Sequence, residues 1–149
     1  MIAFNIAEFA GPIVVTCVYF FFWYYLLLFR QRGTKVRLAK EYAQRGEVFD
    51  RYFGQNEEML AVDRVVTNTH EQMVPFVVTL WLFSLCVSSF YATILGSLYI
   101  CLRAIYPLLL GKKVSKMNTK RVSLVTMPCY AIILTFIIST LIVVFENLF

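Results

Sequence analysis

Three long runs without a charged residue limit what this chain can fold into. They contain 21, 31 and 24 residues and lie at 9–29, 72–102 and 122–145. A helix needs about 20 apolar residues to cross the hydrocarbon core of a bilayer. The first and last runs therefore suit one span each, whereas the middle run is long enough for two and divides at Ser88-Ser89.

These runs predict four transmembrane helices. Helices are favoured over strands because the runs are long and show no strict alternation of apolar and polar residues. Hydrophobic residues make up 60% of the chain, above the roughly 45–50% of soluble domains. We predict an all-α integral membrane four-helix bundle that forms one domain over residues 1–149. The predicted helices lie near 8–30, 58–88, 92–110 and 120–146.

All but two of the lysines and arginines fall into two of the three connections between these helices. The first connection holds Arg30, Arg32, Lys35, Arg37, Lys40, Arg45 and Arg51, and the third holds Lys112, Lys113, Lys116, Lys120 and Arg121. Both connections lie on one face of a four-span bundle, so the positive-inside rule puts them in the cytosol and both termini outside or in a lumen. The net charge of +5 then predicts contact with anionic lipid head groups rather than nucleic acid. The four cysteines stand singly, without a CxxC or Cys/His pair, which argues against zinc binding and redox-pair chemistry.

The second predicted helix carries ionisable residues inside the membrane. Arg64, Asn68 and Glu71 stand at i, i+4 and i+7, within an arc of about 60° on one helix face. Arg103 and Tyr106 share a face of the third helix in the same way. Placing an arginine inside the membrane costs at least about 2.5 kcal/mol of free energy unless the side chain is paired or hydrated. We therefore expect both faces to point into the bundle or toward another subunit.

Two interpretations of these residues remain open. Glu71 could pair with Arg103 and Asn68 could link two helices, so that the network fixes helix register. Alternatively, the residues line a polar pocket near the cytosolic boundary of the membrane. Two guanidinium groups suit the carboxylates of an anionic ligand, while Glu71 and Asn68 suit an ammonium group and backbone amides. This pattern indicates an amino-acid-like or small peptide ligand.

The same residues resemble the signature of a known family. Arg64-Val-Val-Thr-Asn68-Thr-His-Glu71-Gln-Met-Val-Pro75-Phe76 resembles the second-helix signature of the MAPEG family, the membrane-associated proteins of eicosanoid and glutathione metabolism. Arg103-Ala-Ile-Tyr106 is similar to the Arg-x-x-Tyr step of the family's third helix, and Lys35-Val-Arg37-Leu-Ala-Lys40 is similar to the basic segment of prostaglandin E synthases. The resemblance covers essentially the whole chain. This chain has Val65-Val66 where many relatives have Ala-His, and Leu110 where a tyrosine often lies.

The resemblance implies a homotrimer that binds glutathione between neighbouring subunits near the cytosolic surface. The chain would then be a membrane-bound glutathione transferase, peroxidase or isomerase acting on lipophilic electrophiles, as in eicosanoid metabolism. The residues implied to bind glutathione are Arg37, Arg64, Asn68, Glu71, Arg103, Tyr106 and Lys120. Arg121 would be the catalytic residue that stabilises the thiolate, with Lys120 as a substitute.

Two other functions are also compatible with the sequence. The chain could be a non-catalytic lipid-binding scaffold of the five-lipoxygenase-activating-protein type, or a MAPEG-like subunit of a larger membrane complex. We expect the membrane of the endoplasmic reticulum or of another organelle such as the mitochondrion. His70, the sole histidine, is predicted to lie on the helix surface and to take no part in proton transfer.

Overall fold

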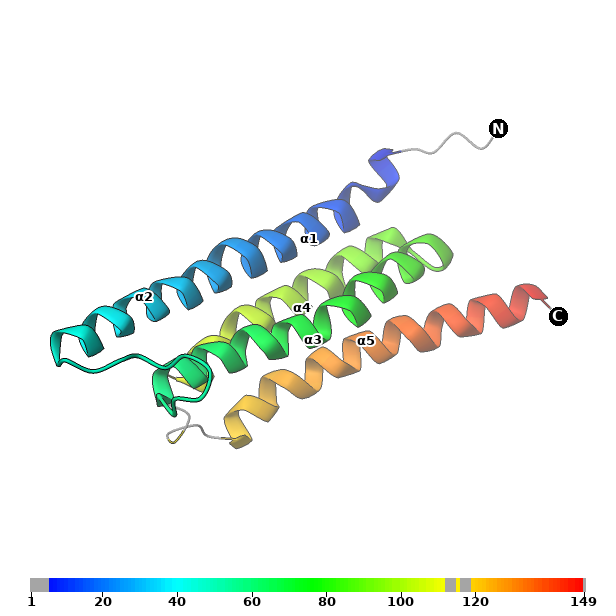
Figure 1. The fold of residues 1–149 in the computed structure, drawn as a ribbon. Helices are drawn as coiled ribbons and strands as arrows, with labels where there is room; N and C mark the ends of the chain where they lie inside the picture. Colours follow the sequence, from blue (N-terminus) through cyan, green and yellow to red (C-terminus); the bar gives the residue numbers. More distant parts are fainter. Residues whose placement is uncertain (1–5, 112–114, 116–118, 149) are drawn as a thin grey trace.

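A computed structural model describes residues 6–111, 115 and 119–148 of the chain. All regular structure in this part is helical, and four long rods lie side by side (Figure 1). The elements are η1 (Ile6–Phe9), α1 (Ala10–Phe21), η2 (Phe22–Leu28), α2 (Phe29–Gln44), α3 (Glu57–Cys86), α4 (Ser89–Leu110) and α5 (Thr119–Leu148).

The first rod is longer than the sequence predicts. It runs without a break through Ile6–Gln44, a helix of 39 residues, so the predicted end near residue 30 is wrong. The residues that follow are mostly strong helix formers, which favour continuation of the helix into water. Gly33 does not interrupt the rod: a glycine inside a helix lowers its stability by only about 1 kcal/mol relative to alanine, and no other atom lies within 4 Å of where its Cβ would be. The rod ends at Gln44, and Gly46, with a φ of +74°, forms the turn that follows it.

The other three rods agree with the predicted helices to within three residues at each end. The Asn56 side chain caps α3 by accepting hydrogen bonds from the backbone N–H groups of Glu58 and Met59. Ser88 caps α4 by accepting from the backbone N–H of Tyr91. These caps satisfy donors that a helix start leaves open, so each fixes where its helix begins.

The rods form an integral membrane bundle. Ile6–Gln44, Ser89–Leu110 and Lys120–Leu148 are long and apolar enough to cross a bilayer. α3 contains 30 residues and is less apolar because of its polar face, but it packs against both α4 and α5. The predicted all-α membrane bundle is thus confirmed.

The two ends of the bundle differ in charge. The start of α1, the end of α5 and the turn between α3 and α4 lie at one end (Figure 1). The outer part of α2, the loop that follows it, the end of α4 and the start of α5 lie at the other. This second end, called the basic end below, carries the described lysines and arginines of both basic connections. Lys112, Lys113 and Lys116 lie outside the described residues.

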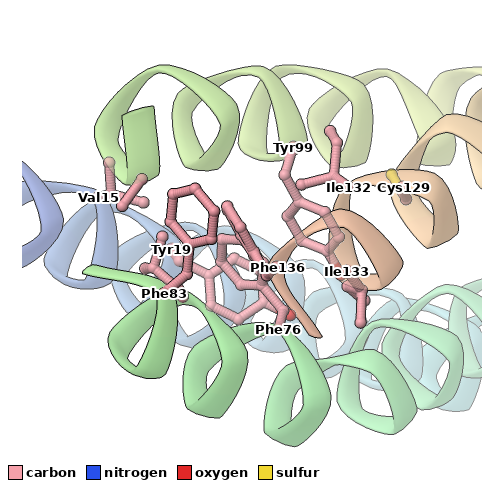
Figure 2. Close-up of a cluster of buried hydrophobic side chains, with 11 residues drawn as sticks. Val15, Tyr19, Phe76, Phe83, Tyr99, Cys129, Ile132, Ile133 and Phe136 are labelled. Atoms are coloured by element: carbon pink, nitrogen blue, oxygen red, sulfur yellow. The ribbon is translucent and has the colours of Figure 1, made fainter. Parts of the chain in front are cut away.

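Two apolar clusters hold the rods together. In the first, Tyr99 stacks on Phe76 with ring centroids 3.8 Å apart, and Tyr19 meets Phe76 edge to face at 5.1 Å (Figure 2). Such aromatic pairs contribute about 0.5–1.5 kcal/mol beyond area burial. The second cluster lies nearer the basic end and contains Trp23, Leu27, Ala61, Val65, Tyr106, Leu110 and Val125.

Candidate binding site

The polar face of α3 forms an open hollow of about 480 Å³, called the α3 hollow below. Its lining residues are Leu60, Asp63, Arg64, Thr67, Asn68 and Glu71. All six belong to one helix, which places Arg64, Asn68 and Glu71 on the shared face that their spacing predicts. One side of the hollow is therefore formed by α3, and no described residue of this chain forms an opposite wall.

The α3 hollow presents one positive and one negative group that are available to a ligand. Arg64 and Glu71 are both exposed, and neither has a hydrogen-bond or ion-pair partner in the described part of the chain. Asp63 differs, because Gln31 Nε2 donates to its Oδ1 at 2.7 Å and Arg51 Nη2 donates to the same oxygen at 3.1 Å. The hollow is therefore suited to a zwitterionic ligand.

Arg103 lies directly behind this face. Its side chain is fully buried, with Nη1 donating to Asn68 Oδ1 at 3.0 Å and Nη2 donating to Thr69 Oγ1 at 2.8 Å. The guanidinium also lies over the Tyr106 ring, 4.7 Å from its centroid. Within the described residues no ion pair joins Arg103 to Glu71, so the Glu71–Arg103 pair considered from the sequence does not form.

This arrangement determines how Asn68 can meet a ligand. Because Arg103 occupies the amide oxygen of Asn68, the Nδ2 group of that half-buried side chain is left as a donor at the hollow. Arg103 also brings a positive charge close to the hollow, and no carboxylate among the described residues forms an ion pair with it. Buried charges are normally paired, so this site favours a ligand that carries negative charge.

A layer of hydrogen bonds behind the hollow fixes the rotation of α3. Tyr19 Oη donates to the backbone oxygen of Thr69 at 3.1 Å, and Tyr99 Oη donates to Gln72 Oε1 at 3.1 Å. Thr69 directly follows Asn68, and Gln72 directly follows Glu71. One position along a helix is a rotation of about 100°, so both side chains point away from the hollow and into the bundle. Sequence reasoning missed these two residues, although their one-residue offset from a polar face was the available signal.

The sequence model of the MAPEG family matches residues 9–142, nearly the whole chain. The chain belongs to the MAPEG family. No curated protein and no solved structure gives a significant match to it. This match confirms the resemblance to the MAPEG family. It also places this MAPEG chain, at the level of the family, in membrane-bound eicosanoid and glutathione metabolism.

The remaining predicted ligand residues of this MAPEG chain do not line the α3 hollow. Arg37 forms ion pairs with Glu41 and Glu58 on the surface of the basic end. Lys120 and Arg121 are exposed at the start of α5. The structure thus brings together Arg64, Asn68 and Glu71, with Arg103 and Tyr106 behind them, and leaves the other three elsewhere on the chain.

Arg121 nevertheless lies at the level of the α3 hollow. Val125, one turn further along α5, packs in the same cluster as Ala61 and Val65 of α3. Arg64 follows Ala61 by three positions, so the start of α5 and the hollow lie at a similar depth. His70 is exposed with its ring 5.4 Å from that of Trp23, in agreement with the predicted surface position. Within the described residues no cluster of histidine, cysteine and acidic side chains could hold a metal ion.

Proposed function

We propose that this MAPEG chain binds glutathione in the α3 hollow and uses its thiolate to attack lipophilic electrophiles. The observation that supports this most is the exposed pair of Arg64 and Glu71, with the amide of Asn68 between them and no partners of their own in the described chain. Glutathione carries two carboxylates, an ammonium group and peptide amides. Arg64 suits a carboxylate, Glu71 suits the ammonium group, and Asn68 suits an amide or carboxylate oxygen.

The missing wall of the hollow supports assembly with further copies of the chain. A site lined by one helix leaves most of a tripeptide in contact with lipid or water, whereas ligand pockets usually bury most of a ligand's surface. A neighbouring subunit of a homotrimer would supply the second wall. The exposed start of α5 lies at the right depth to face the hollow of a neighbour, which would bring in Arg121 and Lys120.

Arg121 is the proposed catalytic residue. A cation beside the sulfur lowers the pKa of a thiol and so supplies the nucleophilic thiolate at neutral pH. With an epoxide, the sulfur forms a bond to carbon as the carbon–oxygen bond breaks, and the alkoxide then takes a proton. Because the hollow lies toward the basic end, water-soluble glutathione can enter from the cytosol while the electrophile arrives through the bilayer.

Calorimetric titration of the detergent-solubilised protein with glutathione tests binding directly. We expect saturable binding by the wild type, and loss of at least tenfold in affinity for Glu71→Gln and for Arg64→Ala. Glu58→Gln is the matched control, because it removes a carboxylate from α3 outside the α3 hollow. A wild-type protein that binds no glutathione would refute the proposal and favour the lipid-binding scaffold.

A second experiment separates chemistry from binding. Arg121→Ala should lower the rate of conjugation with a generic aromatic electrophile and move the pH dependence of that rate to higher pH, because the bound thiol loses its cation. Glutathione affinity should change much less than for Arg64→Ala. An unchanged pH profile would show that another group stabilises the thiolate.

A further inference from the structure

The outward surface of the first rod carries a groove that the proposed chemistry does not use. Its floor is two rows of side chains at helical spacing along α1, η2 and α2: Phe20, Tyr24 and Leu28 form one row, and Phe21, Tyr25 and Phe29 form the other. Ring centroids within the rows lie 6.2 Å apart for Phe20 and Tyr24, 5.1 Å for Phe21 and Tyr25, and 6.0 Å for Tyr25 and Phe29. The groove between the rows measures about 740 Å³ and is almost entirely apolar.

A cluster of cations lies next to the groove, on the side toward the basic end of the bundle. Arg32 lines the aromatic groove and also a second hollow of about 310 Å³, called the cationic hollow below. Gln31, Lys35 and Arg51 complete the cationic hollow, and no carboxylate of the described residues lines it. Arg51 Nη1 is buried and has no hydrogen-bond partner within the described residues. The hollow therefore gathers three positive side chains, and among the described residues Arg51 alone of the three has an acidic partner, Asp63.

The dimensions of the groove match one leaflet of a bilayer. Twelve residues separate Phe20 from Arg32, which is about 18 Å along a helix. Half of the hydrocarbon core is about 15 Å thick. A molecule whose charged group lies at Arg32 would thus have its apolar part along the two aromatic rows within the same leaflet.

We propose that the aromatic groove and the cationic hollow together bind one anionic glycerophospholipid of the leaflet at the basic end. Its phosphate accepts hydrogen bonds from Arg32, Lys35 and Arg51, and one acyl chain lies between the aromatic rows. A head group with net negative charge is favoured over a zwitterionic one, because three cations otherwise stay undercompensated. This site lies on the first rod and on Arg51 of the loop that follows it, whereas the glutathione hollow lies on α3. Asp63 borders both, through its ion pair with Arg51. The groups proposed to bind glutathione, Arg64, Asn68 and Glu71, take no part in the lipid site, so each proposal can fail without the other.

Native mass spectrometry of the full-length protein can count the bound lipid. Delipidated protein in a neutral detergent is incubated with dioleoyl phosphatidylserine, with dioleoyl phosphatidylcholine, or with inorganic phosphate. We expect one bound phosphatidylserine with at least fivefold higher affinity than phosphatidylcholine, and no retained phosphate. R32Q/K35Q should reduce phosphatidylserine binding at least fivefold, whereas R30Q/K40Q, which removes the same charge from α2 outside the cationic hollow, should not.

A second pair of variants tests the groove. F21A/Y25A should weaken binding of phosphatidylserine severalfold, while F90A/Y91A, which removes an exposed aromatic pair at the far end of α4, should leave it unchanged. Equal binding of phosphatidylcholine, equal loss in R30Q/K40Q, or binding of inorganic phosphate alone would overturn the proposal. So would a wild-type protein with no bound phospholipid, as expected if another copy of the chain covers the groove.

Discussion

Replacing Arg103 by methionine separates two roles that its position allows. The buried guanidinium could hold α3 and α4 in register, or it could present the Asn68 amide to a ligand. Methionine has a similar length and is apolar, so the change removes the charge and both hydrogen bonds without leaving a large cavity. The stability and the glutathione affinity of Arg103→Met then report on different roles.

The structure lets the stability change be worked out. Hydrogen bonds to a charged group contribute about 1.5–3 kcal/mol each, so the bonds to Asn68 and Thr69 total about 3–6 kcal/mol. Against this, an arginine inside a membrane helix costs about 2.5–3.5 kcal/mol. Arg103→Met should therefore lower stability by only about 0–3 kcal/mol, a fall in melting temperature of at most about 10 °C.

Ligand binding should suffer more. Without Arg103 the Asn68 amide can rotate, and the charge that favours an anionic ligand is gone. We expect glutathione affinity to fall at least tenfold, or about 1.4 kcal/mol, in calorimetry, while thermal scans still show a cooperative transition. Arg103→Lys keeps the charge but lacks the planar fork of donors, and should bind with intermediate affinity. Wild-type affinity in an Arg103→Met protein that melts more than about 10 °C lower would refute the ligand role and support the register role.

Three further predictions follow from the packing and the loop. Gly96→Leu should destabilise the bundle by about 1–3 kcal/mol, because even a Cβ would lie 2.8 Å from Val15 Cγ1; thermal melting measures this, and Val15→Ala should restore part of the loss. Tyr99→Phe should cost about 1 kcal/mol by removing the hydrogen bond to Gln72, and an unchanged melting temperature would contradict that bond. Backbone N–H groups that donate to the Asp50 carboxylate hold its pKa below the ordinary value of 3.8. Its contribution to loop order is thus full above about pH 4 and lost as pH falls through the lowered pKa, and carbon NMR of the carboxyl group checks this.

The sequence predicted the membrane helices well because each of them contains a long run without charged residues. The uncharged runs bound the spans, and Ser88 marks the turn between α3 and α4. The face of Arg64, Asn68 and Glu71 was predictable too, because helical periodicity alone determines which residues of one helix share a side.

The first rod shows where such reasoning failed. The basic segment after residue 30 was interpreted as a connection because it is polar, yet polarity only says that a segment leaves the membrane. Arginine, lysine and glutamine are good helix formers in water, and the exposed Arg37–Glu41 pair at i, i+4 adds a little to helix stability. The helix therefore continues until Gln44.

The partners of Arg103 could not be predicted for a different reason. Periodicity indicated that this residue faces the bundle, and it does. Which side chain it meets depends on the relative height and rotation of α3 and α4, which the packing of Phe76, Tyr99 and their neighbours sets. Glu71 and Asn68 differ in direction by about 60° on α3, and this difference decides that Asn68 meets Arg103 while Glu71 remains exposed.

The length of the first rod has a consequence for how fast an anion reaches the protein. A helix of 39 residues is about 58 Å long, whereas a bilayer with its head groups is about 40–45 Å thick. The overhang is about 13–18 Å, so the end of the rod near Gln44 lies beyond the head groups by more than the Debye length of about 8 Å at physiological ionic strength, with Lys40 and Arg45 beside it. The rod thus extends a positive electrostatic potential into the aqueous phase. This potential would attract glutathione, which carries a net negative charge. The association rate of glutathione should then fall steeply with added salt while its dissociation rate changes little.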